Sequence, residues 1–206
     1  MKDQECKEMI VKLKGNLSSG NYVLPWSELI FGQARTGAVL VPMMIYSGSI
    51  RIMFVRRQSF LRRHPGEIAF PGGQKDFDDI TPVDTALREM EEETGIYSSD
   101  IDIIGLMDRE YTIGSDFGVV PVAGLINSPF PPSVVPEEQE IDEILYFDLI
   151  EDFEGPEWKT FWSGNMEHSY PVYRIDSNTV IWGLTGRILF KMRNFIMKED
   201  CHESYR

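Results

Sequence analysis

Four glutamates crowd the stretch from residue 88 to residue 93, which reads REMEEE. Glu89, Glu92 and Glu93 are three and four residues apart, so on an α-helix they point to the same side. Like charges at these spacings destabilise a helix by roughly a few tenths of a kcal/mol per pair. A hard divalent ion such as Mg²⁺ would offset them, because it takes oxygen ligands and shares them between carboxylates and phosphates. The stretch predicts a metal site for phosphate chemistry, with a solvated acidic helix face as the alternative.

Two neighbouring features favour the metal site. The paired glycines of Phe70-Pro71-Gly72-Gly73 allow close backbone approach and can lend a carbonyl oxygen to a metal ion. Arg88 can pair with Glu92 at a spacing of four residues. One guanidinium does not neutralise four glutamates, so a further cation is expected.

A second chemical feature is a local run of cations in an acidic chain. The 206 residues include 33 acidic and 20 basic side chains, for a formal net charge of -13. Within fourteen residues, however, stand Arg51, Arg56, Arg57, Arg62, Arg63 and His64. The planar fork of arginine holds a phosphate through two hydrogen bonds, so this loop is expected to attract substrate phosphates. Ordinary surface arginines that balance nearby acids are the alternative.

Local signals predict a helix from about residue 82 to residue 94 that carries the glutamates. Thr81 is a typical N-cap residue and is followed by proline at the first helical position. Gly95 suits the position just beyond the helix end, where a left-handed backbone is common. An apolar stripe for the core consists of Val83, Ala86, Leu87, Met90 and Thr94.

The other elements predict a mixed sheet flanked by helices. Strand patterns occupy residues 38–41 and 50–55, which form a hairpin, and residues 101–106, 119–126, 141–147, 170–175 and 179–182. Helices are predicted over 4–14 and 184–198. This order predicts one α+β or α/β domain over residues 1–206, with its core at about 36–197 and a helical appendage in 1–20.

Composition and short sequence signals indicate the cellular compartment of the protein and the kinds of partner that it binds. Cys6 and Cys201 lack the CxxC spacing, so neither a zinc site nor a disulfide framework is indicated. The longest apolar stretch, residues 38–46, contains a proline and is far shorter than the roughly 20 residues that span a bilayer. The start of the chain shows no signal peptide. We expect a cytoplasmic protein with a small-molecule partner and without nucleic-acid or membrane partners.

Residues 73–96 resemble the signature of the Nudix hydrolase family. The signature is a glycine, five residues, a glutamate, seven residues and then R-E-U-x-E-E-x-G-U, where U is bulky and apolar. Residues 88–96 match every fixed position of the second half, and Gly73 matches the leading glycine. Asp79 replaces the first glutamate, with eight residues before Arg88 instead of seven, which leaves its role open. The resemblance implies a Nudix-type α/β/α sandwich and hydrolysis of a diphosphate with Mg²⁺ or Mn²⁺.

The change at Asp79 is similar to the coenzyme A pyrophosphatase branch, in which an aspartate and one extra residue are usual. That branch carries L-L-T-x-R-S-x-x-x-R-x-H-x-G-x-x-x-F-P-G-G ahead of the signature. Residues 53–73 match it at Arg57, Arg62, His64, Gly66, Phe70, Pro71, Gly72 and Gly73. Val55 stands for the threonine and Gln58 for the serine. Residues 181–185 also look like a stretch common near the end of this branch.

The resemblance implies roles for individual residues. It implies metal binding by Glu89, Glu93, Glu92 and the Gly73 carbonyl, catalytic roles for Glu92, Glu93 and Arg88, and substrate binding by Arg57, Arg62, His64 and Gly66. Glu92 is a further ligand or the base, and Arg88 orients the glutamates. A later loop can add one more carboxylate from Glu137, Glu138 or Glu140.

The expected reaction is attack of water on one phosphorus of coenzyme A, which yields 4′-phosphopantetheine and adenosine 3′,5′-bisphosphate. Two alternatives stay open. The first is a Nudix pyrophosphatase for another nucleoside diphosphate derivative, such as ADP-ribose, a dinucleoside polyphosphate or a nucleoside triphosphate. The second is a Nudix-fold ligand sensor that binds without cutting. A homodimer is a further expectation.

Overall fold

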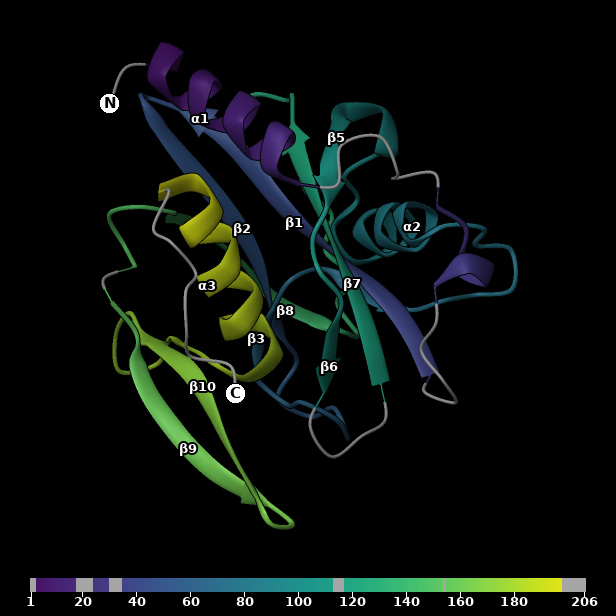
Figure 1. Ribbon diagram of the computed structural model, residues 1–206. Coiled ribbons are helices and arrows are strands. Elements are labelled where there is room, and N and C mark those ends of the chain that lie inside the picture. Colours follow the sequence, from purple (N-terminus) through teal and green to yellow (C-terminus); the bar gives the residue numbers. More distant parts are fainter. Residues whose placement is uncertain (1–2, 18–23, 30–34, 113–116, 154, 198–206) are drawn as a thin grey trace.

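The computed structural model describes residues 3–17, 24–29, 35–112, 117–153 and 155–197. Within them, an eight-stranded mixed sheet has β1 (Arg35–Tyr46) at its centre (Figure 1). β1 pairs antiparallel with β2 (Ser49–Arg57) and parallel with β7 (Phe117–Ile126). The other strands of this sheet are β3 (Ile68–Ala69), β4 (Gly72–Gln74), β5 (Ile101–Leu106), β6 (Glu110–Thr112) and β8 (Ile141–Asp148).

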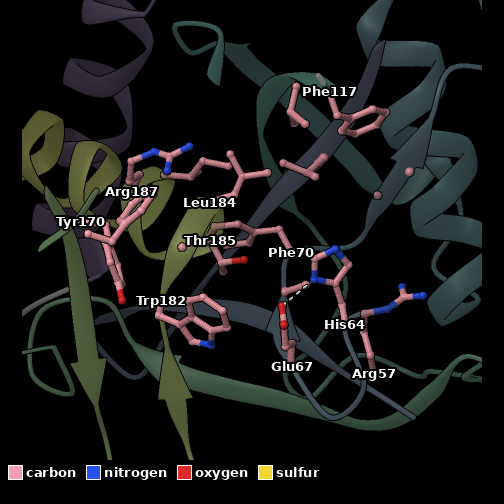
Figure 2. A pocket seen from close by; sticks show the side chains of 18 residues that line it. Arg57, His64, Glu67, Phe70, Phe117, Tyr170, Trp182, Leu184, Thr185 and Arg187 are labelled. Carbon is pink, nitrogen blue, oxygen red and sulfur yellow. Dashed lines mark hydrogen bonds and ion pairs between the residues drawn. The ribbon is translucent and has the colours of Figure 1, made fainter. Parts of the chain in front are cut away.

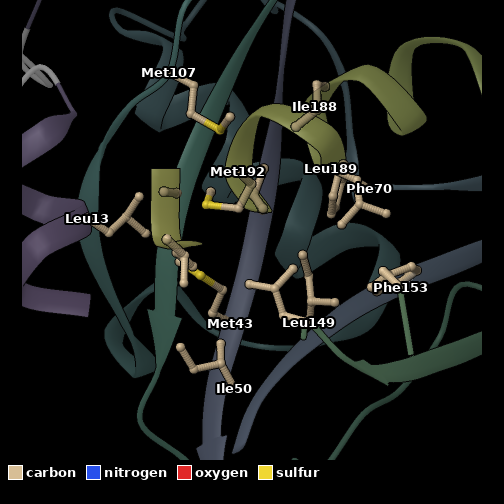
Figure 3. Close-up of a cluster of buried hydrophobic side chains, with 14 of the residues drawn as sticks. Leu13, Met43, Ile50, Phe70, Met107, Leu149, Phe153, Ile188, Leu189 and Met192 are labelled. Atoms are coloured by element: carbon tan, nitrogen blue, oxygen red, sulfur yellow. The ribbon is translucent and has the colours of Figure 1, made fainter. Parts of the chain in front are cut away.

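Helices cover both faces of this sheet. α2 (Pro82–Thr94) lies on one face, and α1 (Asp3–Asn16) and α3 (Gly183–Met197) lie on the other (Figure 1). Successive side chains of β1 alternate between the two cores, with Leu40 on the α2 side and Val41 on the α1 and α3 side. Leu13 from α1 and Met192 from α3 meet the sheet in the larger core (Figure 3). The predicted α/β/α sandwich with a mixed sheet is confirmed.

A smaller antiparallel sheet projects beside α3. It consists of β9 (Glu157–Ser163), β10 (Met166–Arg174) and β11 (Val180–Ile181), and the β9–β10 hairpin extends away from the main sheet (Figure 1). Two short 3-10 helices, η1 (Trp26–Glu28) and η2 (Ser98–Asp100), complete the described elements. No helix in the described part of the chain is both long and apolar enough to cross a membrane.

Most predicted elements are present, with small shifts at their ends. The 38–41 and 50–55 hairpin, the 82–94 helix and the 101–106 strand are confirmed, and α3 begins one residue earlier than predicted. Lys198, Cys201 and residues 18–20 lie outside the described residues. α1, expected as an appendage, contributes Cys6 and Leu13 to the larger core. The sequence patterns predict no strand at β3, β4, β6 or β9.

Candidate active site

Both ends of α2 are held by local contacts that set the direction of its glutamates. At the N-terminus, the Thr81 hydroxyl accepts a hydrogen bond from the Asp84 amide (3.2 Å), and the Asp84 carboxylate accepts one from the Thr81 amide (2.8 Å). At the C-terminus, Gly95 adopts a left-handed conformation with φ 74°, and its amide donates to the Glu91 carbonyl (2.8 Å). Ala86 and Met90 are buried against the sheet, so the helix cannot rotate without exposing them.

Glu93 is the most deeply placed of the signature glutamates. Only 5% of the residue is exposed, and its Oε2 accepts a hydrogen bond from the Gly72 amide (3.1 Å). Burial raises the pKa of this carboxyl to about 8, and the neighbouring Glu89 carboxylate acts in the same direction. The Gly72 amide and Arg57 oppose the shift without cancelling it. A cation next to Glu93 would favour its ionised form.

Glu89 lies directly against the backbone of β4. A Cβ atom at Gly73 would collide with both carboxylate oxygens of Glu89, so a side chain at this position would displace that carboxylate. β4 is held in place by its pairing with β1, where Gly73 faces Ala38. Burial raises the pKa of Glu89, whereas Arg88 acts to lower it. This packing brings the carboxylate oxygens of Glu89 next to the backbone of β4.

Arg88 is the centre of a hydrogen-bonded cluster. Its guanidinium donates to Asp79 (3.0 Å), Glu89 (2.9 Å) and Glu92 (2.9 Å), and also to the Gln74 carbonyl (3.1 Å). Asp79 is 6% exposed. Burial works to raise the pKa of Asp79, but the hydrogen bonds from Arg88 and from the Asp76 amide hold it below its ordinary value. Asp79 therefore anchors Arg88, which in turn contacts Glu89 and Glu92. The sequence alone left the role of Asp79 open.

Arg57 lies between two carboxylates from different parts of the chain. Its Nη1 atom is 3.6 Å from Glu93, and its Nη2 atom is 3.6 Å from Glu140. The loop before β8 brings Glu140 here because it docks on the C-terminus of α2, where the Val135 amide donates to the Thr94 carbonyl (2.8 Å). Of the three acidic candidates in this loop, Glu140 is the one joined to the site by an ion pair in the described residues.

A cavity of about 510 Å³ opens beside these groups (Figure 2). One end reaches Gly72, Gly73 and Arg57, and the other runs toward the β9–β10 hairpin and the start of α3. This volume falls within the range of ordinary small-molecule pockets. The signature carboxylates and a ligand-sized hollow therefore adjoin one another.

A family model and known relatives match this chain. The model described as NUDIX domain matches residues 35–160, which is more than half of the chain. The chain belongs to the Nudix family. Two relatives, both called "Uncharacterized Nudix hydrolase NudL", come from Pectobacterium atrosepticum and Yersinia pestis. The first is 32% identical over 170 residues, covering 82% of this chain and 86% of the relative. The second is 30% identical over 196 residues, covering 90% and 92%.

A solved Nudix structure agrees with the fold. The crystal structure of a MutT/nudix family protein from Enterococcus faecalis covers 96% of this chain and 76% of its own, with a TM-score of 0.53 and 15% identity. The predicted enzyme class is confirmed: this Nudix protein is a hydrolase that acts on pyrophosphate bonds. The alternative of a ligand sensor gains no support from relatives named hydrolases.

Nudix hydrolases generally use divalent metal ions, and the donor set of this one fits such an ion. In the described ranges, no three His, Cys, Asp or Glu side chains are grouped so that they could hold a metal ion. Arg57 and Arg88 form ion pairs with Glu93 and Glu89. The donors are nevertheless all oxygens, which a hard cation prefers. The raised pKa of buried Glu93 also fits a bound cation. A cation next to this carboxylate would offset the unfavourable free energy of burying its negative charge.

The structure gathers most of the predicted site residues of this Nudix hydrolase. Gly73, Arg88, Glu89, Glu92 and Glu93 lie together, and Arg57 joins them.

The remaining predicted residues lie farther along the 58–67 loop. Arg62 is exposed, and His64 pairs with Glu67 at 2.9 Å while lining the cavity. Gly66 has φ 69° and its amide donates to the Arg57 carbonyl (3.1 Å), so it shapes the turn of this loop.

Proposed function

We propose that this Nudix hydrolase cleaves the diphosphate of coenzyme A or a derivative, giving 4′-phosphopantetheine and adenosine 3′,5′-bisphosphate. The observation that carries the proposal is the position of Arg57. This arginine belongs to the segment that resembles the coenzyme A branch, and it lies 3.6 Å from both Glu93 and Glu140. The segment that indicates the substrate thus adjoins the glutamates that indicate the reaction.

Each side chain has a proposed task. Glu89, Glu93 and the Gly73 carbonyl hold a divalent cation, Mg²⁺ or Mn²⁺, and Glu92 is a further ligand or the base. When bound, such an ion lowers the pKa of water and offsets charge on the transferred phosphoryl group. Arg88, anchored by Asp79, orients Glu89 and Glu92.

The cations of the preceding loop have the task of binding phosphate. Arg57 has a planar fork of donors that suits a phosphate oxygen pair, so substrate would draw it from the carboxylates. Water attacks one phosphorus, and the bond from that phosphorus to the bridging oxygen breaks. Arg62 and His64 contact the substrate from the same loop.

The decisive assay is hydrolysis of coenzyme A with Mg²⁺ and with Mn²⁺, with products identified by mass. Glu93→Gln is expected to lower kcat/KM by about 100-fold or more, because it removes a charged oxygen ligand. Glu91→Gln is the matched control, since Glu91 is on the same helix but exposed. Undiminished hydrolysis by Glu93→Gln would show that the metal assignment is wrong.

A substrate panel separates coenzyme A from the other diphosphates. ADP-ribose, a dinucleoside polyphosphate and a nucleoside triphosphate would use the same carboxylates, so α2 does not distinguish them. The 53–73 segment favours coenzyme A, and its arginines provide for the extra 3′-phosphate. Turnover of ADP-ribose equal to or better than that of coenzyme A would overturn the choice. Homodimer formation stays a prediction.

A further inference from the structure

The cavity beside the glutamates is built largely by parts of the chain outside the signature. Its floor comes from β1 and β7, and its outer wall comes from Phe161 on β9, Tyr170 on β10 and Trp182 just before α3. Figure 2 shows Trp182 and Tyr170 on the side of the cavity opposite His64 and Glu67. The β9–β10 hairpin therefore contributes to the ligand site, although it lies apart from the main sheet.

The lining of this cavity is largely apolar. Its deep surface carries hydrocarbon and aromatic side chains, namely Val39, Phe70, Phe117, Val119, Leu184 and Ile188. A nucleobase buried against such a surface would leave ring nitrogens without partners, and each unsatisfied group costs about 1–3 kcal/mol. The hydrocarbon tail of an acyl chain would carry no such cost there, whereas the amide groups of a pantetheine arm would need polar partners such as the Thr185 hydroxyl, which also lines the cavity.

The charged groups that line the cavity are already paired. Arg187 is 7% exposed and donates to Glu110 (3.0 Å) and to the Tyr111 carbonyl (2.6 Å). His64 pairs with Glu67 at 2.9 Å, and Glu67 would repel an anion. Among the described charged groups that line the cavity, Arg57 is the one next to the glutamates, where a diphosphate would draw it from Glu93 and Glu140. The cavity thus has one end that suits a phosphate, whereas the basic side chains in its interior are paired with Glu110 and Glu67 and do not provide a site for a second phosphate.

We infer that this cavity binds the pantetheine arm of the substrate, preferably with an acyl chain on its sulfur, and excludes the phosphorylated nucleoside. The inference rests on the proposed function for the identity of the substrate. Coenzyme A carries an anionic nucleoside 3′-phosphate on one side of its diphosphate and an uncharged, linear arm on the other. The linear arm with an acyl chain at its end matches a largely apolar hollow that reaches Gly73 and Arg57. Phe161, Tyr170 and Trp182 are the specificity-determining residues.

The test uses the two halves of the substrate, which lack a diphosphate and are not hydrolysed. S-octanoyl-4′-phosphopantetheine, S-acetyl-4′-phosphopantetheine and adenosine 3′,5′-bisphosphate are titrated calorimetrically into the full chain with Mg²⁺. Each buried methylene raises affinity by about fourfold, so the octanoyl compound is expected to bind at least about tenfold tighter than the acetyl compound. Equal affinities would overturn the inference.

Two variants and one control locate the effect. Trp182→Ala is expected to reduce the octanoyl preference below about threefold, whereas Trp162→Ala keeps it, because Trp162 is 67% exposed and outside the cavity lining. Ala69→Leu narrows the cavity from β3 and is expected to weaken octanoyl binding without affecting the bisphosphate. If both Trp182→Ala and Ala69→Leu weaken the bisphosphate instead, the cavity binds the nucleoside and the inference is wrong.

The outcomes separate this inference from the proposed function. Hydrolysis of coenzyme A without an octanoyl preference refutes the cavity assignment alone. An octanoyl preference that depends on Trp182, in a protein that does not hydrolyse coenzyme A, refutes the proposed function alone. Thermal unfolding of each variant shows whether it is folded before either conclusion is drawn.

Discussion

Replacing Glu93 by glutamine is expected to remove a pH dependence of stability from the metal-free protein. Burial raises the pKa of this carboxyl from 4.5 to about 8. The folded state therefore holds the proton more tightly than the unfolded chain does. Its stabilising effect is complete below about pH 4.5 and is lost as pH rises through about 8. Glutamine does not ionise, so the free energy of unfolding of the variant should not fall in this way as pH rises.

The size of the effect follows from the width of the pH window. Between the two pKa values, one such group changes the free energy of unfolding by about 1.4 kcal/mol per pH unit. From pH 5 to pH 8 the loss is about 4 kcal/mol, a large part of the roughly 5–15 kcal/mol that stabilises a typical domain. Groups remote from Glu93 contribute to both proteins alike, so the difference between the two reports Glu93 together with the neighbouring Glu89 carboxyl, which is coupled to it.

The measurement is urea unfolding followed by tryptophan fluorescence, with EDTA present, at several pH values from 5 to 8. The free energy of unfolding of Glu93→Gln is expected to gain about 4 kcal/mol relative to wild type across this range. Glu91→Gln, with an exposed side chain, should follow wild type. Saturating Mg²⁺ should reduce the loss in wild type, because the ion binds the ionised carboxylate. Parallel pH curves for wild type and Glu93→Gln would refute the reasoning.

Three further substitutions test the supports of the site. Asp79→Asn should lower kcat/KM by about tenfold, because Arg88 loses its charged anchor at 3.0 Å, and unchanged kinetics would show that Arg88 needs no anchor. Gly73→Ala should weaken Mg²⁺ binding, measured by calorimetry, because the added Cβ collides with Glu89; wild-type affinity would contradict the close approach. Thr81→Val should lower the free energy of unfolding by about 1 kcal/mol in urea through loss of the N-cap, and no change would mean that the cap is dispensable.

Features encoded by neighbouring residues were predictable from the sequence. α2 begins after Thr81 and ends before Gly95, as predicted, because capping residues act within one helical turn. Its apolar stripe was predicted in the same way, since helical periodicity alone decides which side chains share a face. The pairing of Arg88 with Glu92 also follows from their spacing along the helix.

Features that depend on contacts between distant residues were not predictable. The Asp79–Arg88 pair depends on the path of the loop before α2, and the choice of Glu140 depends on a loop that docks on the far end of that helix. β9 was missed because its side chains are mostly exposed on both faces, so no alternating apolar pattern marks it. Without β9, the wall of the cavity could not be foreseen.

The parallel pairing of β1 with β7 has a consequence for how the protein is made. β2 follows β1 directly in the sequence, so these two strands can pair early. The other edge of β1 pairs with β7, which begins at Phe117, about 80 residues after Arg35. During synthesis on the ribosome, one edge of a long apolar strand therefore stays open until most of the sheet has emerged. Such an edge can pair with another nascent chain. The growing chain is expected to be prone to aggregation until β7 is complete, which makes chaperone binding most useful in that interval.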